Sequence, residues 1–315
     1  MRVIRHLPDV GSRLSRAVLT LGNFDGVHRG HQAIIERARF QATRHDGQVV
    51  VLTFHPHPVA VLAPERASGM IQSLHDRLGT LRALGVEVVV AQRFSRAFAA
   101  LDPEAFVERF LLRSMDLVHV VVGYNVTFGR GRKGTATTLE TLGTRLGFGV
   151  DAVGPVMGGG DAVSSSGIRH AITAGDVERV ESLLGRRHRL RGRVMRGEQR
   201  GRTLGFPTAN LQLGPRVLVP ADGVYAVWVH AGGLVHPGVV NIGVRPTFGE
   251  LRRTIEAHVL DWSGDLYGSW LEIELVRRLR GELRFVGSEA LREAIASDVA
   301  RARDVLAELP CAPSS

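Results

Sequence analysis

The chain changes its pattern of secondary structure near Gly185, and this change limits the folds that it can adopt. Before Gly185, short apolar runs alternate with stretches whose apolar residues recur at helical spacing. After it, short runs of loosely alternating apolar and polar residues follow one another, with Gly, Pro and Asp between them. Alternating strands and helices form parallel α/β sheets, whereas successive strands form antiparallel ones. The sequence therefore predicts two domains, residues 1–185 and residues 186–315.

The apolar runs of the first domain are continuous and rich in valine, as expected for strands that are buried on both faces. They are Ala17–Leu21, Val49–Phe54, Val86–Ala91 and Leu117–Val122. Helical patterns follow them at Gln32–Arg44, Leu74–Leu84, Asp102–Leu112 and Thr138–Leu146. This order predicts a Rossmann-like domain with a parallel sheet, whose ligands bind at the carboxyl ends of its strands.

The second domain contains strand patterns and one long helix. The strand patterns are Leu190–Met195, Val224–Val229, Pro237–Ile242, Ile255–Leu260 and Leu271–Val276. Five or six strands of this length can close into a small antiparallel β-barrel. Ser288–Leu309 has an apolar stripe, so we expect a C-terminal helix that packs against the barrel.

Composition removes several kinds of chemistry. Cys311 is the only cysteine, which excludes disulfides, cysteine-based zinc clusters and cysteine catalysis within the chain. No apolar run has the length of a signal peptide or a membrane span, so we expect a soluble cytoplasmic protein. The net charge of +9 suits anionic small molecules and also nucleic acid.

Lys133 is the only lysine among 40 basic residues. A phosphate-binding P-loop needs Gly-Lys followed by Ser or Thr, and this chain has no such sequence. Any phosphoryl transfer must therefore use arginines, helix N-termini and a metal ion.

The stretch Leu21–Gln32, LGNFDGVHRGHQ, joins the first predicted strand to the first predicted helix. The unpaired N–H groups at the start of such a helix favour a phosphate. His28 and His31 are three residues apart, so both imidazoles would lie on the same side of the first turn. Paired histidines can also bind a metal, but the sequence offers no third ligand nearby.

Three further segments follow strands at the predicted binding edge or precede a helix. In His55-Pro56-His57-Pro58 the histidines are either structural turn residues or part of a site. The loop Gly123–Arg130 is either a phosphate clamp or a solvated basic loop. Ser164, Ser165 and Ser166 are either helix caps or, with Arg169, phosphate contacts.

The second domain carries GRTLGFPTAN at residues 201–210. Its glycines allow the backbone to approach a diphosphate, and the Thr208 and Asn210 oxygens suit Mg²⁺. Glu256 lies within a predicted strand, where a carboxylate needs a partner or a function, or else is an exposed sheet residue.

These motifs carry a resemblance that covers nearly the whole chain. The pattern G-x-F-D-x-x-H-x-G-H resembles that of the HxGH nucleotidylyltransferases. Its residues are similar to those of the bacterial bifunctional riboflavin kinase/FAD synthetase family. The string GRxxGFPTAN is similar to the riboflavin kinase signature of that family. The chain departs from the family pattern at Tyr124, Val126 and Thr127, and Ser166 replaces a threonine.

The resemblance implies two ATP-dependent reactions that use Mg²⁺. The barrel would phosphorylate riboflavin to FMN, with Glu256 as general base and Thr208 and Asn210 as Mg²⁺ ligands. The first domain would adenylylate FMN to FAD, with His28 and His31 as its catalytic residues. The implied ATP and phosphate contacts of the first domain are Gly22, Asn23, Phe24, Asn125, Ser164, Ser165, Ser166 and Arg169. Those of the kinase, for ATP and flavin, are Gly201, Arg202, Gly205, Phe206, Pro207, Thr208 and Asn210.

Two rival interpretations stay open at this point. In one, only the barrel is active, because loop residues of the first domain depart from the family pattern. In the other, the basic barrel is a platform for nucleic acid, with Phe206, Tyr225, Trp228 and Trp262 as stacking residues. The scarcity of aromatic residues on any one strand argues against the platform, so we expect small-molecule partners only.

Overall fold

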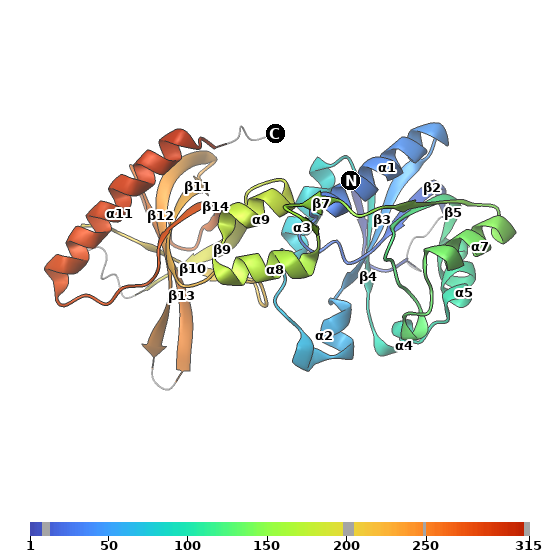
Figure 1. The fold of residues 1–315 in the computed structure, drawn as a ribbon, viewed down its shortest axis with the longest axis horizontal. Helices are drawn as coiled ribbons and strands as arrows, with labels where there is room; N and C mark the ends of the chain where they lie inside the picture. Colours follow the sequence, from blue (N-terminus) through green and yellow to red (C-terminus); the bar gives the residue numbers. More distant parts are fainter. Residues whose placement is uncertain (8–12, 198–204, 248–249, 312–315) are drawn as a thin grey trace. The chain divides into compact units, whose positions relative to one another are not determined.

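The computed structural model describes residues 1–7, 13–197, 205–247 and 250–311, and it divides into two compact units (Figure 1). The first unit is Met1–Ser165 and the second is Ser166–Ser315. The helices α8 (Ser165–Ala174) and α9 (Val177–Leu184) are grouped with the second unit, apart from Ser165. The domain boundary after Gly185 remains a prediction.

The described part of the first unit contains a six-stranded parallel sheet in the order β1-β4-β3-β2-β5-β6. The strands are β1 (Arg2–Ile4), β2 (Leu14–Leu21), β3 (Gln48–His55), β4 (Val88–Arg93), β5 (Met115–Gly123) and β6 (Gly149–Val153). The chain leaves β2 toward β3 and β4 on one side, and β5 and β6 lie on the other. The order therefore reverses between β2 and β5, and ligands of open parallel sheets bind beyond the strand ends at such a point.

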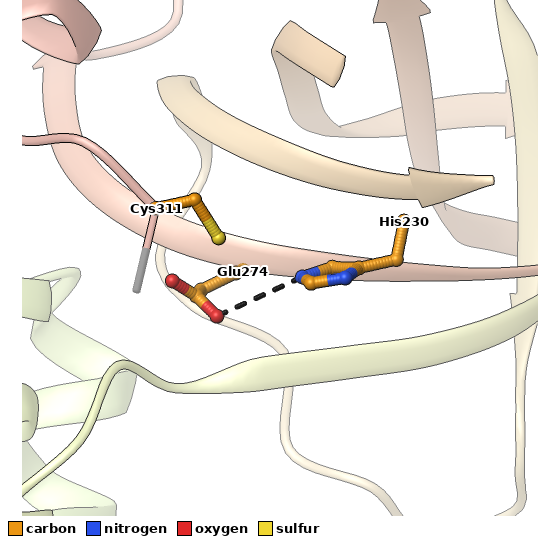
Figure 2. A group of neighbouring side chains, drawn as sticks. All are labelled: His230, Glu274 and Cys311. Atoms are coloured by element: carbon orange, nitrogen blue, oxygen red, sulfur yellow. Dashed lines mark ion pairs between the residues drawn. The ribbon is translucent and has the colours of Figure 1, made fainter. Parts of the chain in front are cut away.

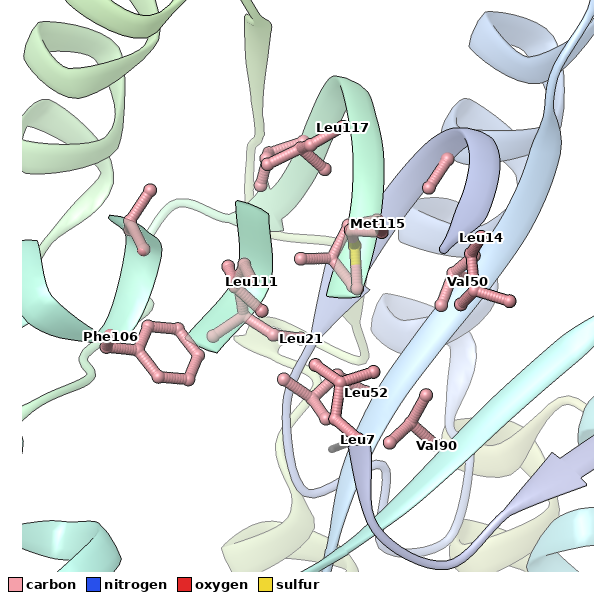
Figure 3. Packing of buried hydrophobic residues seen from close by; sticks show 14 of the residues in the cluster. Leu7, Leu14, Leu21, Val50, Leu52, Val90, Phe106, Leu111, Met115 and Leu117 are labelled. Carbon is pink, nitrogen blue, oxygen red and sulfur yellow. The ribbon is translucent and has the colours of Figure 1, made fainter. Parts of the chain in front are cut away.

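Both faces of this sheet are covered, which explains the continuous apolar strands. On one face, α1 (Arg29–Arg44) and α3 (Leu74–Ala83) pack on buried valines of β2, β3 and β4. On the other, Phe106 and Leu111 join Leu21, Leu52 and Val90 in the larger core cluster (Figure 3). Leu139 belongs to the same cluster. The expected helix at 102–112 is interrupted by a π-helix, Phe106–Leu111, between α5 (Pro103–Ala105) and α6 (Leu112–Ser114).

Further helices and a two-stranded hairpin complete the described part of the first unit. They are α2 (Pro58–Leu62), the 3₁₀-helices η2 (Pro64–Arg66) and η4 (Arg130–Arg132), α4 (Arg96–Ala99), α7 (Ala136–Leu146) and the hairpin strands β7 (Met157–Gly158) and β8 (Asp161–Ala162).

The second unit contains the predicted antiparallel barrel, closed in the order β10-β13-β12-β11-β14-β9 (Figure 1). Its strands are β9 (Arg189–Met195), β10 (Ala209–Leu213), β11 (Gly223–Ala231), β12 (Leu234–Thr247), β13 (Glu250–Val259) and β14 (Trp270–Arg280). Its interior is filled by buried side chains such as Tyr225, Val227 and Ile273. The helix α11 (Ser288–Glu308) packs outside, where Ala302 and Leu306 contact the outward side chains of β11 and β12. The predicted fold class is thus confirmed in both units.

Candidate active sites

The two histidines of the first unit stand at the start of α1 and stack on each other. His28 is the N-cap residue, and its Nδ1 accepts a hydrogen bond from the backbone N–H of His31 at 3.4 Å. The two rings are 3.7 Å apart between centroids and 21° from parallel. A side chain at Gly30 would press within 3.2 Å of the His28 ring, so a glycine between the histidines allows the stack.

The loop before α1 is held by buried polar contacts. The Asp25 carboxylate, fully buried, accepts hydrogen bonds from the backbone N–H groups of Ile71 and Gln72. The buried Arg77 guanidinium donates to the Asn23 carbonyl oxygen at 2.7 Å and to the Thr53 hydroxyl at 3.1 Å. These contacts fix the loop beside the histidines although Phe24 and Val27 adopt left-handed backbone conformations, at φ 48° and 40°.

A cavity of about 330 Å³ lies at this point and collects most of the residues predicted for adenylyl transfer. It is lined by Gly22, Asn23, Phe24, His28, His31, Asn125, Ser164 and Ser165, among others. Ser165 also donates a hydrogen bond from its hydroxyl to the Asp25 carbonyl oxygen, at 3.1 Å. Ser166 and Arg169 follow on α8 within the second unit, and their part in this site remains a prediction.

A second cavity, of about 570 Å³, was not expected from the sequence. It is lined by five phenylalanines, namely Phe54, Phe94, Phe98, Phe106 and Phe128. Their rings contact one another at centroid distances from 5.5 Å, as in Phe54 and Phe94, to 6.0 Å, as in Phe98 and Phe106. The phenylalanines come from separate segments between β3 and the loop after β5, so no single stretch of sequence signals the cavity.

The two cavities share a wall. Leu21, Gly22, Asn23, Val126 and Thr127 line both of them. These residues end β2 or follow β2 and β5, the strands between which the sheet order reverses. A polar cavity and an aromatic cavity thus meet where the topology favours ligand binding.

The histidines at positions 55 and 57 serve the turn. His57 caps α2, and its Nδ1 accepts the backbone N–H of Val59 at 3.3 Å. Partial burial, and then the charge of Arg77, lower the pKa of His55. Phe54 and Pro58 line the aromatic cavity, whereas the two histidines are not among the residues that line it. The structural interpretation of this segment therefore fits best.

In the barrel, strand register brings the predicted kinase residues onto one face. Asn210 on β10 is paired with Glu256 on β13, and Glu256 is also paired with Asn241 on β12. Residues directly opposite in a sheet point to the same side, and so do residues two apart on one strand. Thr208 precedes β10 by one residue and is two residues from Asn210.

Three cavities are lined by the predicted kinase residues and their neighbours. Thr208, Glu256 and Phe206 line one of about 310 Å³, together with Asn241, His258 and residues of α11. Thr208 and Pro207 also line one of about 480 Å³, whose other lining residues include Trp262 and Tyr267. Asn210 lines a third, of about 520 Å³. Thr208 and Glu256 thus share a cavity, while Asn210 faces an adjacent one.

Contacts around Phe206 and Pro207 position the segment before β10. The His258 Nδ1 lies 2.8 Å from the Pro207 carbonyl oxygen, and the His258 ring meets the Phe206 ring edge to face, with centroids 5.6 Å apart. Gly205 precedes them with φ 86°, a left-handed conformation that favours glycine. Gly201 and Arg202 lie outside the described residues, so their predicted contacts remain predictions.

The cavity of Thr208, Glu256 and Asn241 offers hard oxygen donors of the kind that Mg²⁺ prefers, so it fits a magnesium ion, and Asn210, the second predicted ligand, lines the adjacent cavity. A different cluster, of His230, Glu274 and Cys311, brings three ligand atoms within 4.8 Å of one another (Figure 2). There, however, Arg187 and Arg189 approach the Glu274 carboxylate oxygens at 3.2 and 2.9 Å. Two guanidinium groups already compensate this carboxylate, and a divalent cation would add to their charge. The cluster is therefore an ion-pair network.

The aromatic residues of the nucleic-acid interpretation do not form a common exposed surface. Tyr225 is fully buried and donates its hydroxyl proton to the Ala221 carbonyl oxygen, at 2.6 Å. Trp228 donates to the Leu309 carbonyl oxygen, at 3.1 Å, and packs in the cluster beneath α11. Trp262 lines the 480 Å³ cavity.

Comparison with known proteins assigns a family to each half of the chain. Residues 11–167 match the family model of FAD synthetase, and residues 184–306 match that of riboflavin kinase. The bifunctional riboflavin kinase/FMN adenylyltransferase of Escherichia coli K12 is 37% identical over 306 residues, covering 96% of this chain and 97% of that protein. The chain belongs to this bifunctional family.

Two further relatives cover nearly the full length. The Pseudomonas fluorescens bifunctional riboflavin kinase/FMN adenylyltransferase is 41% identical and covers 98% of each chain. A crystal structure from Streptococcus pneumoniae, described as a macrolide-efflux protein, is 32% identical, with a TM-score of 0.88 over 96% of this chain and 98% of that chain. In the described part of this family member, none of the helices combines the length and the apolar character needed to cross a membrane.

The buried arginine beneath the first site gives a stability prediction. Arg77→Met keeps a long side chain with an apolar stem but removes the guanidinium that donates to Asn23 and Thr53. A hydrogen bond from a charged group contributes about 1.5–3 kcal/mol, so we expect urea unfolding to show a loss of that size. FAD formation should fall as the loop loosens, while FMN formation in the barrel persists. Arg82→Met, on the exposed side of the same helix, is the control and should change the unfolding free energy by less than about 0.5 kcal/mol. Equal stability of the two variants would contradict this role for Arg77.

Proposed function

We propose that the first unit adenylylates FMN in the cavity of His28 and His31, and that the barrel phosphorylates riboflavin in the cavity of Thr208 and Glu256. The observation that carries the first assignment is the stacked histidine pair at the start of α1, in a polar cavity that shares a wall with an aromatic one. The second rests on the register that aligns Asn210, Glu256 and Asn241.

Adenylyl transfer needs placement and charge stabilisation and no covalent intermediate. A phosphate oxygen of FMN attacks the α-phosphorus of ATP in line, and the bond to pyrophosphate breaks. Because the Nδ1 of His28 accepts the His31 N–H, the proton of a neutral His28 ring is carried by Nε2, which can donate to a phosphate oxygen. The N-terminus of α1 favours the same negative charge. Gly22, Asn23, Phe24, Asn125, Ser164, Ser165, Ser166 and Arg169 are the proposed ATP and phosphate contacts.

The aromatic cavity suits the isoalloxazine ring of FMN. Its volume of about 570 Å³ falls within the range of about 300–1,000 Å³ that is typical of small-molecule sites. Its phenylalanine rings offer flat apolar contacts to a planar ligand. The shared wall would then bring the FMN phosphate toward the nucleotide cavity.

In the barrel, Glu256 is the proposed general base. It accepts the proton of the riboflavin 5′-hydroxyl as that oxygen attacks the γ-phosphorus of ATP, and ADP leaves. The Thr208 hydroxyl and the Asn210 amide are the proposed Mg²⁺ ligands, and the ion, when bound, neutralises charge on the phosphates. Gly205, Phe206 and Pro207, with Gly201 and Arg202 outside the described residues, complete the proposed ATP and flavin contacts.

The substrates are therefore riboflavin, FMN and ATP, and the products include FMN and FAD. A cytoplasmic location is part of the proposal. It is supported by the single cysteine, since chains of oxidising compartments more often carry paired cysteines.

Incubation with riboflavin, ATP and Mg²⁺, followed by chromatography of the flavins, tests both activities together. We expect FMN to appear first and FAD later, and we expect EDTA to stop the formation of both. FMN alone would support an enzyme in which only the barrel is active. Neither product would refute the proposal.

His28→Ala separates the two reactions. A lost hydrogen-bond donor to a developing charge typically lowers the rate by about 10²–10³-fold. We expect adenylylation of supplied FMN to fall at least that far and riboflavin phosphorylation to continue. His75→Ala, at an exposed position of α3, is the matched control. Retained adenylylation in His28→Ala would remove this histidine from the mechanism.

Glu256→Gln should have the opposite effect. The loss of a general base typically lowers the rate by about 10²–10⁴-fold, so FMN formation should fall by that factor. Adenylylation of supplied FMN should be spared, because the first unit is unchanged. Glu293→Gln, at an exposed position of α11, is the control. A normal kinase rate in Glu256→Gln would end the assignment.

A further inference from the structure

The aromatic cavity has one charged group in its lining. Of the described residues that line it, Arg132 alone has an ionisable side chain, and the others are apolar except for Asn23 and Thr127. The Arg132 Nε donates to the Thr127 hydroxyl oxygen at 2.9 Å. Thr127 belongs to the wall that the aromatic and nucleotide cavities share. The guanidinium is therefore anchored where the two cavities meet.

The backbone of Arg132 is unusual. Its φ is 60°, in the left-handed region that residues other than Gly and Asn rarely adopt. Gly129 and Gly131 in the same loop are also left-handed, at φ 71° and 63°, and there glycine relieves the strain. Residues kept in strained backbone conformations cluster at ligand sites, so this conformation directs attention to the Arg132 side chain.

The neighbouring Arg130 provides a contrast. Its guanidinium forms an ion pair with Asp102 at 2.8 Å, and both side chains are more than half exposed. It is not among the residues that line the aromatic cavity. The two arginines are two residues apart and have equal charge, yet the cavity is lined by Arg132.

We propose that Arg132 binds the 5′-phosphate of FMN and thereby makes the adenylylation site select FMN over unphosphorylated riboflavin. This inference rests on the proposed function of the first unit. Riboflavin and FMN carry the same isoalloxazine ring, so an aromatic cavity alone cannot distinguish them. They differ in the terminal phosphate, which an arginine binds through charge-assisted hydrogen bonds that a neutral hydroxyl cannot match.

The position of Arg132 also suits the reaction. The FMN phosphate must reach the α-phosphorus of ATP across the wall formed by Asn23 and Thr127, and Arg132 is held at Thr127. Holding two phosphate oxygens there leaves the third to attack. Selection at this step matters, because a riboflavin hydroxyl that attacked the α-phosphorus of ATP in place of the phosphate would release pyrophosphate and give a riboflavin ester of AMP, with one phosphate where FAD has two.

The test compares Arg132→Gly, Arg132→Gln and the control Arg130→Gln in the full chain. The measured quantities are the KM for FMN and for ATP in FAD formation and the inhibition constant of lumiflavin, which has the ring system but no ribityl phosphate. We expect both Arg132 variants to raise the KM for FMN by about 10- to 100-fold. The KM for ATP, the lumiflavin inhibition constant and the riboflavin kinase rate should stay within about twofold. Arg130→Gln should leave all of them unchanged.

Thermal unfolding adds a readout that a purely structural role would move. Because glycine suits φ 60°, Arg132→Gly should melt no lower than the unchanged protein while its KM for FMN rises. A lower melting temperature, an equal effect of Arg130→Gln, or a lumiflavin constant that rises with the KM for FMN would overturn the proposal. If the unchanged protein forms FAD and the Arg132 variants keep its KM for FMN, this inference fails and the function proposed for the first unit stands. If the unchanged protein forms no FAD from supplied FMN, both fail.

Discussion

Two buried charges, Asp25 in the loop after β2 and Arg77 on α3, hold the first site together. The Asp25 carboxylate accepts hydrogen bonds from backbone N–H groups, and the Arg77 guanidinium donates to a carbonyl and to a hydroxyl. A charge buried without such partners would cost far more than the fold could offset. These contacts fix the loop, which can therefore keep Phe24 and Val27 in left-handed conformations next to the histidines.

The second site is built in another way. In the barrel, Asn210, Glu256 and Asn241 lie in one row because three neighbouring strands pair in register. A slip by one residue would turn all the side chains of a strand to the opposite face, so the buried interior of the barrel also fixes the row. Loop anchoring and strand register thus solve the same problem, which is to hold polar groups for a phosphate without a lysine.

Sequence reasoning succeeded where the pattern was local. Valine-rich runs predicted β2 to β5, because strands that are buried on both faces have few polar positions. The HxGH motif predicted the start of α1. Sequence reasoning missed β1 with three residues, β6 with Asp151 at its centre, and β10 with two amide side chains. These strands are too short or too polar for their periodicity to stand out. The π-helix at Phe106–Leu111 also escaped, since a helical repeat does not reveal a change in hydrogen bonding.

Features assembled from distant segments could not be read from the chain. Arg77 looks like an ordinary polar residue of an amphipathic helix, and only the fold shows that it is 1% exposed. The phenylalanines of the aromatic cavity are spread from Phe54 to Phe128, and their meeting depends on the sheet order. Burial and convergence are properties of topology, whereas motifs record short stretches.

The wall that the two cavities of the first unit share has a consequence for turnover. FAD contains both a flavin and an adenosine, so it would occupy the aromatic cavity and the nucleotide cavity at the same time and would be bound at both ends. Pyrophosphate would be bound in the nucleotide cavity only. Under the proposed reaction, FAD must lose its contacts in both cavities before the next substrates can bind.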